Sequence, residues 1–438
     1  MSVNQNIRPI TAEVKENLVI GGCDTVELAK QYGTPLYVVD ELSLRTIAQE
    51  YKTAFSSYAN SQILYASKAL SNLAIYNILA EEGLGFDVVS GGELYTAHKA
   101  GVNMSTVMFN GNNKQDWELD LAIKLGVGRI SVDNFYEIEL LSQIALKHNK
   151  KVDLLLRITP GIDCHTHEYI QTGQLDSKFG FDLMQVDDAV EQILKEPLLN
   201  LKGLHAHIGS QIFDDKGFKD EVNILVGELA RLNSQYALSM DEVNLGGGLG
   251  VKYVETDTPP DVADIAKSVI NALKQAILEY KTPELTLYVE PGRSIISPCG
   301  VTLYTIGSTK QVPNGTKYVS VDGGMADNPR HALYQAEYSC DVANKMSLPS
   351  SEKVTIAGRY CESGDILIEN VELPPLEAGD ILCVYNTGAY NYSMASNYNR
   401  VQKSAMVLVN NSQSDIIVYR ETLEDLISHE SIPDRLNK

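Results

Sequence analysis

Eight short apolar runs alternate with longer stretches of helical periodicity between residues 62 and 290, and this alternation constrains the fold more than any other feature of the sequence. Strands that alternate with helices pair in parallel through right-handed crossover connections. Eight such units within about 250 residues predict a parallel (β/α)8 barrel. A doubly wound open sheet is the alternative. The predicted strands are residues 62–69, 86–90, 107–110, 129–134, 152–159, 201–210, 242–248 and 285–290.

The pattern of predicted secondary structure changes after residue 293. Apolar runs continue, but Gly, Pro and Asn turns separate them and few helical stretches lie between them. A chain of 438 residues is also long for one domain. We therefore predict an α/β protein with two domains. Residues 34–293 form the barrel, and residues 1–33 and 294–438 form a mainly β domain to which the N-terminal segment contributes.

The composition argues against several classes of partner. A net charge of -21 disfavours binding to nucleic acid or to an anionic membrane. No apolar run approaches the roughly 18 residues of a membrane helix, and no basic segment leads into an apolar one at the N-terminus. Six cysteines are scattered without a CxxC pair, which is typical of reduced cytosolic thiols. We expect a cytoplasmic protein with a small-molecule substrate.

Polar side chains stand where the predicted barrel strands end, and the functional groups of such barrels gather at these ends. The first is Lys68, which closes an apolar run. A neutral lysine amine is a nucleophile that forms Schiff bases with carbonyls, although a lysine at a strand end can also simply extend to water. The other polar residues at strand ends are Asp87, Ser90, Asn110, Asp133, Arg157, His207, Ser210, Glu290 and Arg293.

The residues after the seventh and eighth strands are suited to bind a phosphate group and a protonated ring nitrogen. The run Gly246-Gly247-Gly248 follows the seventh strand, where barrels often bind phosphate through backbone N–H groups, although it could be only a tight turn. After the eighth strand, Glu290 could balance a protonated ring nitrogen and Arg293 could bind an anion. An internal Glu–Arg ion pair is the alternative reading of these two residues.

His205 and His207 share one face of the sixth strand. A metal site with Asp214 as third ligand is disfavoured, because no other His or Cys falls at ligand spacing, and we expect no metal. A flat imidazole that stacks on a planar ring is the better interpretation of His207. A reactive lysine, a phosphate cradle, a carboxylate and a stacking imidazole are together the groups that pyridoxal 5'-phosphate requires.

The sequence resembles the fold-type III pyridoxal-phosphate decarboxylases, and among them the group that acts on meso-2,6-diaminopimelate. The resemblance covers nearly the whole chain. It implies a homodimeric carboxy-lyase that makes L-lysine and CO2 in the last step of lysine biosynthesis. The motifs that carry the resemblance are residues 65–69 (YASKA), 87–94 (DVVSGGEL), 207–211 (HIGSQ), 246–248 (GGG), 290–293 (EPGR), 361–365 (CESGD), 388–390 (GAY) and 393–399 (SMASNYN).

The resemblance also implies roles for particular residues. Lys68 would bind the cofactor aldehyde, His207 would stack on the ring, Glu290 would keep the ring nitrogen protonated, and Asp87 would lie near the ring. Cys361, Glu362 and Tyr390 would reach a cofactor bound mainly by the partner subunit, and Cys361 or Lys68 would return a proton to Cα. The phosphate would be held by Gly246, Gly247, Gly248, Gly292 and Arg293 with Ser210 nearby, and the substrate by Arg293, Arg330, Tyr334, Glu362 and Tyr390.

Other activities remain open at this point. A decarboxylase of ornithine, arginine or carboxynorspermidine, an amino acid racemase, and a non-catalytic relative share parts of the pattern. An arginine clamp disfavours ornithine and lysine as substrates, since neither carries a distal carboxylate. The sequence departs from the family pattern at residues 401–404 (VQKS) and around Tyr334, and the second departure concerns the substrate pocket.

Overall fold

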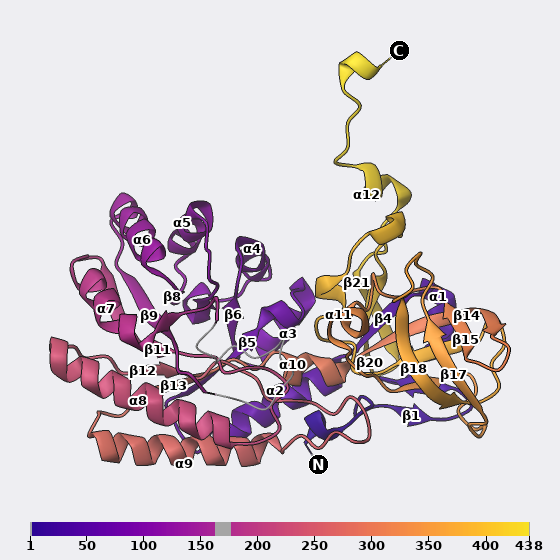
Figure 1. Ribbon diagram of the computed structural model, residues 1–438, viewed down its shortest axis with the longest axis horizontal. Helices are drawn as coiled ribbons and strands as arrows, with labels where there is room; N and C mark the ends of the chain where they lie inside the picture. The colour runs from indigo at the N-terminus through magenta and orange to yellow at the C-terminus, as the bar shows by residue number, and fades with distance from the viewer. Residues whose placement is uncertain (1, 163–176, 438) are drawn as a thin grey trace. The chain divides into compact units, whose positions relative to one another are not determined.

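The computed structural model of the protein describes residues 2–162 and 177–437 (Figure 1). Cys164, one of the predicted reduced thiols, lies outside the described residues. The other five cysteines are free thiols. No helix within the described part of the chain is long and apolar enough to cross a membrane. The chain divides into two compact units: Met1–Asn6, Leu44–Lys252 and Thr256–Ile296 form the first, and Ile7–Ser43, Tyr253–Glu255 and Ser297–Lys438 form the second.

The first unit is a closed barrel of eight parallel strands, which confirms the predicted (β/α)8 fold. Each strand pairs in parallel with its neighbours, and β13 pairs with β5 to close the ring. A short strand, β10 (Phe181–Asp182), adds a further parallel pairing to β9. The barrel strands are β5 (Ser61–Ala66), β6 (Gly85–Val88), β7 (Val107–Phe109), β8 (Arg129–Val132), β9 (Val152–Thr159), β11 (Leu199–His205), β12 (Glu242–Asn244) and β13 (Thr286–Val289).

Helices follow the strands and lie around the outside of the barrel (Figure 1). Several begin at a polar residue whose side chain accepts backbone N–H groups of the first turn: Asn72 caps α3, Ser90 caps α4 and Asn134 caps α6. The helices are α2 (Glu41–Phe55), α3 (Leu73–Glu81), α4 (Gly91–Lys99), α5 (Asp116–Leu125), α6 (Phe135–His148), α7 (Val186–Leu194), α8 (Lys216–Tyr236), α9 (Val262–Tyr280) and α10 (Arg293–Ile296).

Several predicted strands extend too far toward their carboxyl ends, and those predicted at 62–69, 201–210 and 242–248 do so by three residues or more. The strand predicted at 62–69 ends at Ala66, and Lys68 lies in the 3-10 turn Ser67–Ala69. The Ser67 hydroxyl draws the chain out of the strand, because it donates to the Asp87 carbonyl at 2.8 Å. The strand predicted at 201–210 ends at His205, so His207 and Ser210 lie in the following loop. These differences move predicted site residues from strands into the loops above them.

The interior of the barrel is filled with apolar side chains below these loops. Leu64, Met108 and Leu155 form a buried cluster against which Tyr288 packs. Burying one such side chain is worth about 1.5–3 kcal/mol. At the amino ends of the strands, Arg129 on β8 forms two hydrogen bonds to Glu242 on β12, of 2.8 and 2.5 Å. The filled interior leaves the loops at the carboxyl ends of the strands to form the site.

The second unit is mainly β, as predicted. Its large sheet has the order β18-β17-β15-β14-β4-β20-β21, with β19 and β16 paired off β14. The N-terminal segment contributes the three-stranded sheet β1-β2-β3 and β4. The strands β16 and β18 were not predicted from the sequence. The bounds are β1 (Glu13–Val14), β2 (Leu18–Ile20), β3 (Cys23–Asp24), β4 (Leu36–Asp40), β14 (Gly300–Gln311), β15 (Lys317–Val321), β16 (Cys340–Val342), β17 (Glu352–Ala357), β18 (Ile366–Leu373), β19 (Ile381–Val384), β20 (Ala405–Asn410) and β21 (Gln413–Val418), with the short helices α1 (Thr25–Tyr32), α11 (Arg330–Tyr334) and α12 (Leu423–Ile427).

One carboxyl in the barrel unit is buried without a hydrogen-bond partner among the described residues. Glu221 on α8 is fully buried, and neither of its carboxyl oxygens has a hydrogen-bond partner in residues 2–162 and 177–437. Burial raises its pKa well above the ordinary value, and the charge of Glu290 raises it further. Burial therefore favours the protonated form of this carboxyl in the folded protein.

We expect Glu221→Leu to raise the free energy of unfolding by about 1–3 kcal/mol at about pH 8. The unfolded chain ionises this carboxyl near pH 4.3. The folded state keeps the proton to higher pH, so the contribution of Glu221 to stability falls as pH rises through that window. Denaturant unfolding at about pH 5 and about pH 8 measures this effect. The free energy of unfolding of Glu221→Leu should exceed that of the wild type by more at about pH 8 than at about pH 5. Asp220→Leu, at an exposed position on the same helix, should show no such growth.

Candidate active site

Lys68 lies at the carboxyl end of β5 among acidic groups of neighbouring strands. Its side chain is half-buried in the turn Ser67–Ala69. The positive charge of Lys68 lowers the pKa of both Asp87 and Glu290, while it also lowers the pKa of His207. These interactions put the predicted amine, the two carboxyls and the imidazole within one electrostatic environment at the mouth of the barrel.

The two carboxyls are joined by an asparagine. Asn110, in the loop after β7, lies with its Nδ2 2.6 Å from Asp87 Oδ1 and 2.9 Å from Glu290 Oε1. Asn244, at the end of β12, donates to the same oxygen of Glu290 at 2.7 Å. All four side chains are buried. Oε1 of Glu290 is thus held by two amides, which fixes the orientation of the carboxylate.

The environment divides the two carboxyls into different charge states. Burial raises the pKa of Asp87, and the nearby charge of Glu290 raises it further. Burial acts on Glu290 in the same direction, but His205, Asn244 and Lys68 outweigh it and hold the pKa of Glu290 below the ordinary value. Two carboxyls so close cannot easily both ionise. The arrangement therefore places a single negative charge on Glu290.

The triglycine loop closes against His207. The backbone N–H of Gly247 donates to His207 Nδ1 at 3.2 Å. A Cβ at Gly247 would lie 2.2 Å from the Glu290 carbonyl oxygen, and one at Gly248, whose φ is +126°, would lie 2.7 Å from the Gly209 carbonyl oxygen. Only glycine fits at these positions. Glycine therefore lets this loop pack closely against the neighbouring backbone, and the Gly246 N–H donates to Asn244 Oδ1 at 2.8 Å.

Arg293 and Ser210 are brought together beside this loop. The Arg293 guanidinium donates to Ser210 Oγ from Nε at 3.2 Å and from Nη2 at 2.9 Å. Arg293 is buried at the start of α10. A Cβ at Gly292 would lie 2.9 Å from the Ala66 carbonyl oxygen, so glycine lets this turn pack against the end of β5. The guanidinium and the hydroxyl are suitable partners for an anion.

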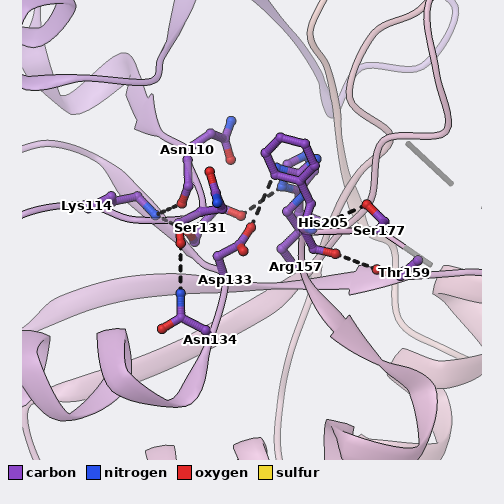
Figure 2. Close-up of polar contacts among 12 residues, drawn as sticks. Asn110, Lys114, Ser131, Asp133, Asn134, Arg157, Thr159, Ser177 and His205 are labelled. Carbon is purple, nitrogen blue, oxygen red and sulfur yellow. Dashed lines mark hydrogen bonds and ion pairs between the residues drawn. The ribbon is translucent and has the colours of Figure 1, made fainter. Parts of the chain in front are cut away.

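Figure 2 shows a second group of polar side chains in the barrel, among them Lys114, Ser131, Asp133, Arg157 and His205. Arg157 Nη1 is 3.6 Å from Asp133 Oδ1, and Ser131 Oγ is 2.8 Å from His205 Nδ1. Lys114, which is buried, donates to the Ser131 carbonyl oxygen at 2.7 Å and to Glu137 at 2.7 Å. This group links the ends of β8, β9 and β11.

Pyridoxal phosphate fits the residues present. Three consecutive glycines form the loop after β12, and glycine-rich loops of this kind bind phosphate through their backbone N–H groups. Asn110 Oδ1 is a buried polar atom without a hydrogen-bond partner in the described residues, and such atoms are typical of a site built for a polar ligand. No group of three His, Cys, Asp or Glu side chains in that part of the chain could hold a metal ion.

In the second unit, Arg330 is surrounded by tyrosines. Its guanidinium carbon lies 5.6 Å from the ring centre of Tyr253, 5.9 Å from that of Tyr334 and 5.6 Å from that of Tyr390. Arg330 is buried, and its Nε has no hydrogen-bond partner in the described chain. A guanidinium in an aromatic cage keeps its charge and can bind a carboxylate with two N–H groups. Tyr253 was not predicted from the sequence.

Cys361 and Glu362 lie on an exposed loop between β17 and β18. The backbone N–H of Cys361 donates to Asn399 Oδ1 at 3.0 Å, and the Tyr398 hydroxyl donates to Glu362. Asp365 anchors the base of the loop, because it accepts the N–H groups of Tyr360 and Met325 at 2.7 Å each. The loop is therefore held at both ends while its thiol and carboxylate stay accessible.

The structure brings Lys68, Asp87, His207, Glu290 and the glycine loop to one end of the barrel, with Arg293 and Ser210 beside them. Separately, in the second unit, it brings Arg330, Tyr334 and Tyr390 together, and it places Cys361 and Glu362 on one loop. The partners that sequence reasoning missed are Asn244, Ser131 and Lys114 in the barrel and Tyr253 in the second unit. Asn244 precedes the glycine run at a strand end, but only the closed barrel brings its amide to Glu290.

Comparisons with known proteins agree with this site. Residues 44–297 match the family model described as the pyridoxal binding domain of pyridoxal-dependent decarboxylases. The chain is 47% identical over 447 residues to a diaminopimelate decarboxylase of Synechocystis, which covers 99% of this chain and 95% of that protein. It is also 47% identical over 414 residues to the Bacillus subtilis enzyme of the same name, with 94% of each chain covered.

A solved structure supports the same conclusion. The diaminopimelate decarboxylase of M. jannaschii in complex with L-lysine superposes with a TM-score of 0.92, at 35% identity, over 100% of both chains. The closed barrel and the family match define a pyridoxal-dependent decarboxylase of fold type III. More narrowly, the chain belongs to the diaminopimelate decarboxylase family.

Proposed function

We propose that the protein decarboxylates meso-2,6-diaminopimelate to L-lysine and CO2, with pyridoxal 5'-phosphate as cofactor, and that this is the last step of lysine biosynthesis. The observation that carries the proposal is the convergence of an amine, an ionised carboxylate and a glycine cradle at one end of the barrel. Relatives named for this activity, at 47% identity over nearly the whole chain, support it.

The barrel residues would hold the cofactor and set its charge. Lys68 would bind the aldehyde, His207 would lie against the ring, and Glu290 would keep the ring nitrogen protonated. Gly246, Gly247, Gly248, Gly292 and Arg293 would hold the phosphate with Ser210. When bound, the cofactor supplies an acceptor for the electron pair that CO2 leaves at Cα. Glu290 strengthens that acceptor through its fixed negative charge.

The second unit would recognise the distal end of the substrate. Arg330, with Tyr334 and Tyr390 around it, would bind the distal carboxylate together with Arg293, and Glu362 would bind the distal ammonium. Tyr398 orients Glu362 through its hydroxyl. Cys361 or Lys68 would be the group that supplies a proton to Cα.

We further propose a cytoplasmic homodimer in which the barrel unit, predicted as residues 34–293, binds the cofactor. In the structure this unit takes up the chain again at Leu44, because β4 belongs to the sheet of the second unit. Residues 1–33 and 294–438 would complete the site of the partner subunit with Cys361, Glu362 and Tyr390. The free thiols of the described cysteines support a reducing compartment. The exposed position of Cys361 and Glu362 supports their use outside their own unit.

A comparison of kcat/KM for several amino acids tests the substrate. We expect CO2 release from meso-diaminopimelate to exceed release from ornithine, arginine and lysine by about 10³-fold or more, since an unpaired arginine clamp penalises substrates without a distal carboxylate. A higher value for ornithine or arginine would indicate the rival decarboxylases. Inversion of the substrate without CO2 release would indicate a racemase.

Arg330→Met should lower kcat/KM for meso-diaminopimelate by about 10²-fold or more, because truncating a buried charged partner costs about 2–5 kcal/mol. The weak rate with ornithine, which offers no distal carboxylate, should change much less. Steady-state kinetics with both substrates measure this difference. Arg231→Met, at a surface ion pair on α8, serves as the control and should leave both rates unchanged. An equal loss with both substrates would contradict the assignment of Arg330.

A further inference from the structure

Glu290 is held differently at its two oxygens. Oε1 lies within hydrogen-bond distance of the amides of Asn110 and Asn244, whereas Oε2 faces His205 Nε2 at 3.6 Å. We infer that Ser131 and His205 act as a pair of positioning residues: a hydrogen bond from Ser131 to Nδ1 favours the His205 tautomer with its hydrogen on Nε2, and this N–H in turn stabilises the negative charge of Glu290 at Oε2. This inference rests on the proposed function, which gives Glu290 its role.

The geometry of the pair is fixed by the barrel. Ser131 is on β8 and His205 is the last residue of β11, and both side chains are almost completely buried. Ser131 Oγ lies 2.8 Å from His205 Nδ1. Buried Lys114 donates to the carbonyl oxygen of Ser131, which anchors the strand end that carries the hydroxyl. The imidazole therefore reaches from Ser131 on one side to Glu290 on the other.

Only one tautomer suits both neighbours. If the Ser131 hydroxyl donates to Nδ1, the ring carries its hydrogen on Nε2 and presents an N–H to the Glu290 carboxylate. If Nδ1 carries the hydrogen instead, Nε2 presents a lone pair to a carboxylate oxygen, and the two repel each other. A neutral imidazole has one donor and one acceptor nitrogen. A hydrogen bond at one nitrogen thus selects the state of the other.

His205 acts as a neutral donor rather than as a cation. Burial lowers its pKa, and the Arg157 charge lowers it further, although Glu290 and Asp133 act in the opposite direction. Lys114 and Glu137, behind Ser131, compensate each other in an ion pair of 2.7 Å. The pair therefore stabilises the charge of Glu290 through an oriented dipole and adds no second charge beneath the cofactor ring.

The affinity of the apoprotein for two cofactors tests the inference. One is pyridoxal phosphate, and the other is its carbocyclic analogue, in which C–H replaces the ring nitrogen. The wild type should prefer pyridoxal phosphate, because only its ring nitrogen can pair with Glu290. Ser131→Ala should reduce this preference about tenfold, and Ser142→Ala, at a buried serine on α6, should not. A merely structural loss would weaken both ligands equally and leave their ratio unchanged.

A second variant distinguishes an effect of Ser131 on the His205 tautomer from an effect on side-chain packing. In His205→Gln the side-chain amide keeps an N–H for Glu290 without a tautomer to select. Adding Ser131→Ala to this variant should therefore change the preference less than twofold. A tenfold further loss in the double variant, or an unchanged ratio in Ser131→Ala alone, would overturn the inference and leave the proposed function standing. Failure of the wild type to bind pyridoxal phosphate through a lysine would instead refute the proposed function.

Discussion

Lys68→Ala is expected to lower kcat for meso-diaminopimelate by about 10⁴-fold or more, because the nearby buried amine of Lys114 is already held by Glu137 and the Ser131 carbonyl oxygen. The structure supports this expectation, since the ammonium of Lys68 acts on Asp87, Glu290 and His207 together. The measurement is CO2 release from substrate with saturating cofactor. The absorbance of lysine-bound pyridoxal phosphate should disappear in the same variant.

Lys147→Ala provides the control for this prediction, because Lys147 is exposed on α6 and pairs with Asp120 at the surface. It should retain both the absorbance and the rate. Added alkylamines should restore part of the Lys68→Ala rate if the amine of Lys68 is what the reaction lacks. If Lys68→Ala retained the lysine-bound absorbance, another lysine would hold the cofactor and the assignment would be wrong.

Glu290→Gln is expected to lower kcat by about 10²–10³-fold, the usual loss when one preorganised electrostatic partner of the transition state is removed. Gln keeps the shape of the side chain and can still pair with Asn110 or Asn244, but it has no negative charge to keep a ring nitrogen protonated. The measurement is single-turnover CO2 release, which separates the chemical step from product release.

Asp87→Asn is the matched comparison for Glu290→Gln. Burial and the charge of Glu290 raise the pKa of Asp87, so its carboxyl is largely protonated where Glu290 is ionised. A neutral amide in place of a neutral acid should cost the chemical step less than tenfold. Equal losses in the two variants would contradict the separation of charge states that the structure indicates.

The barrel could be predicted from the sequence because its parallel strands are buried on both faces. Such strands read as continuous apolar runs, and the helices between them keep their own periodicity. The ends of the strands were less accurate. Lys68 and His207 were placed in strands, but hydrogen bonds made by Ser67 and the glycine loop turn the chain before these residues. Such tertiary contacts cannot be seen in local sequence patterns.

The site residues with distinctive chemistry could be proposed from the sequence, whereas their partners could not. Lys68, Glu290 and the triglycine run are unusual at strand ends. Ser131 and Asn244 are ordinary polar residues inside apolar strands, and only the closure of the barrel places them beside His205 and Glu290. Tyr253 was missed for a similar reason, since its contact with Arg330 joins residues far apart in the chain.

The most direct test of the account is the product made by the purified protein from meso-2,6-diaminopimelate with added pyridoxal phosphate. We predict one L-lysine for each CO2 released, and no product when the cofactor is removed from the protein. Formation of CO2 without L-lysine, or no reaction with this substrate under conditions in which another amino acid is decarboxylated, would contradict it.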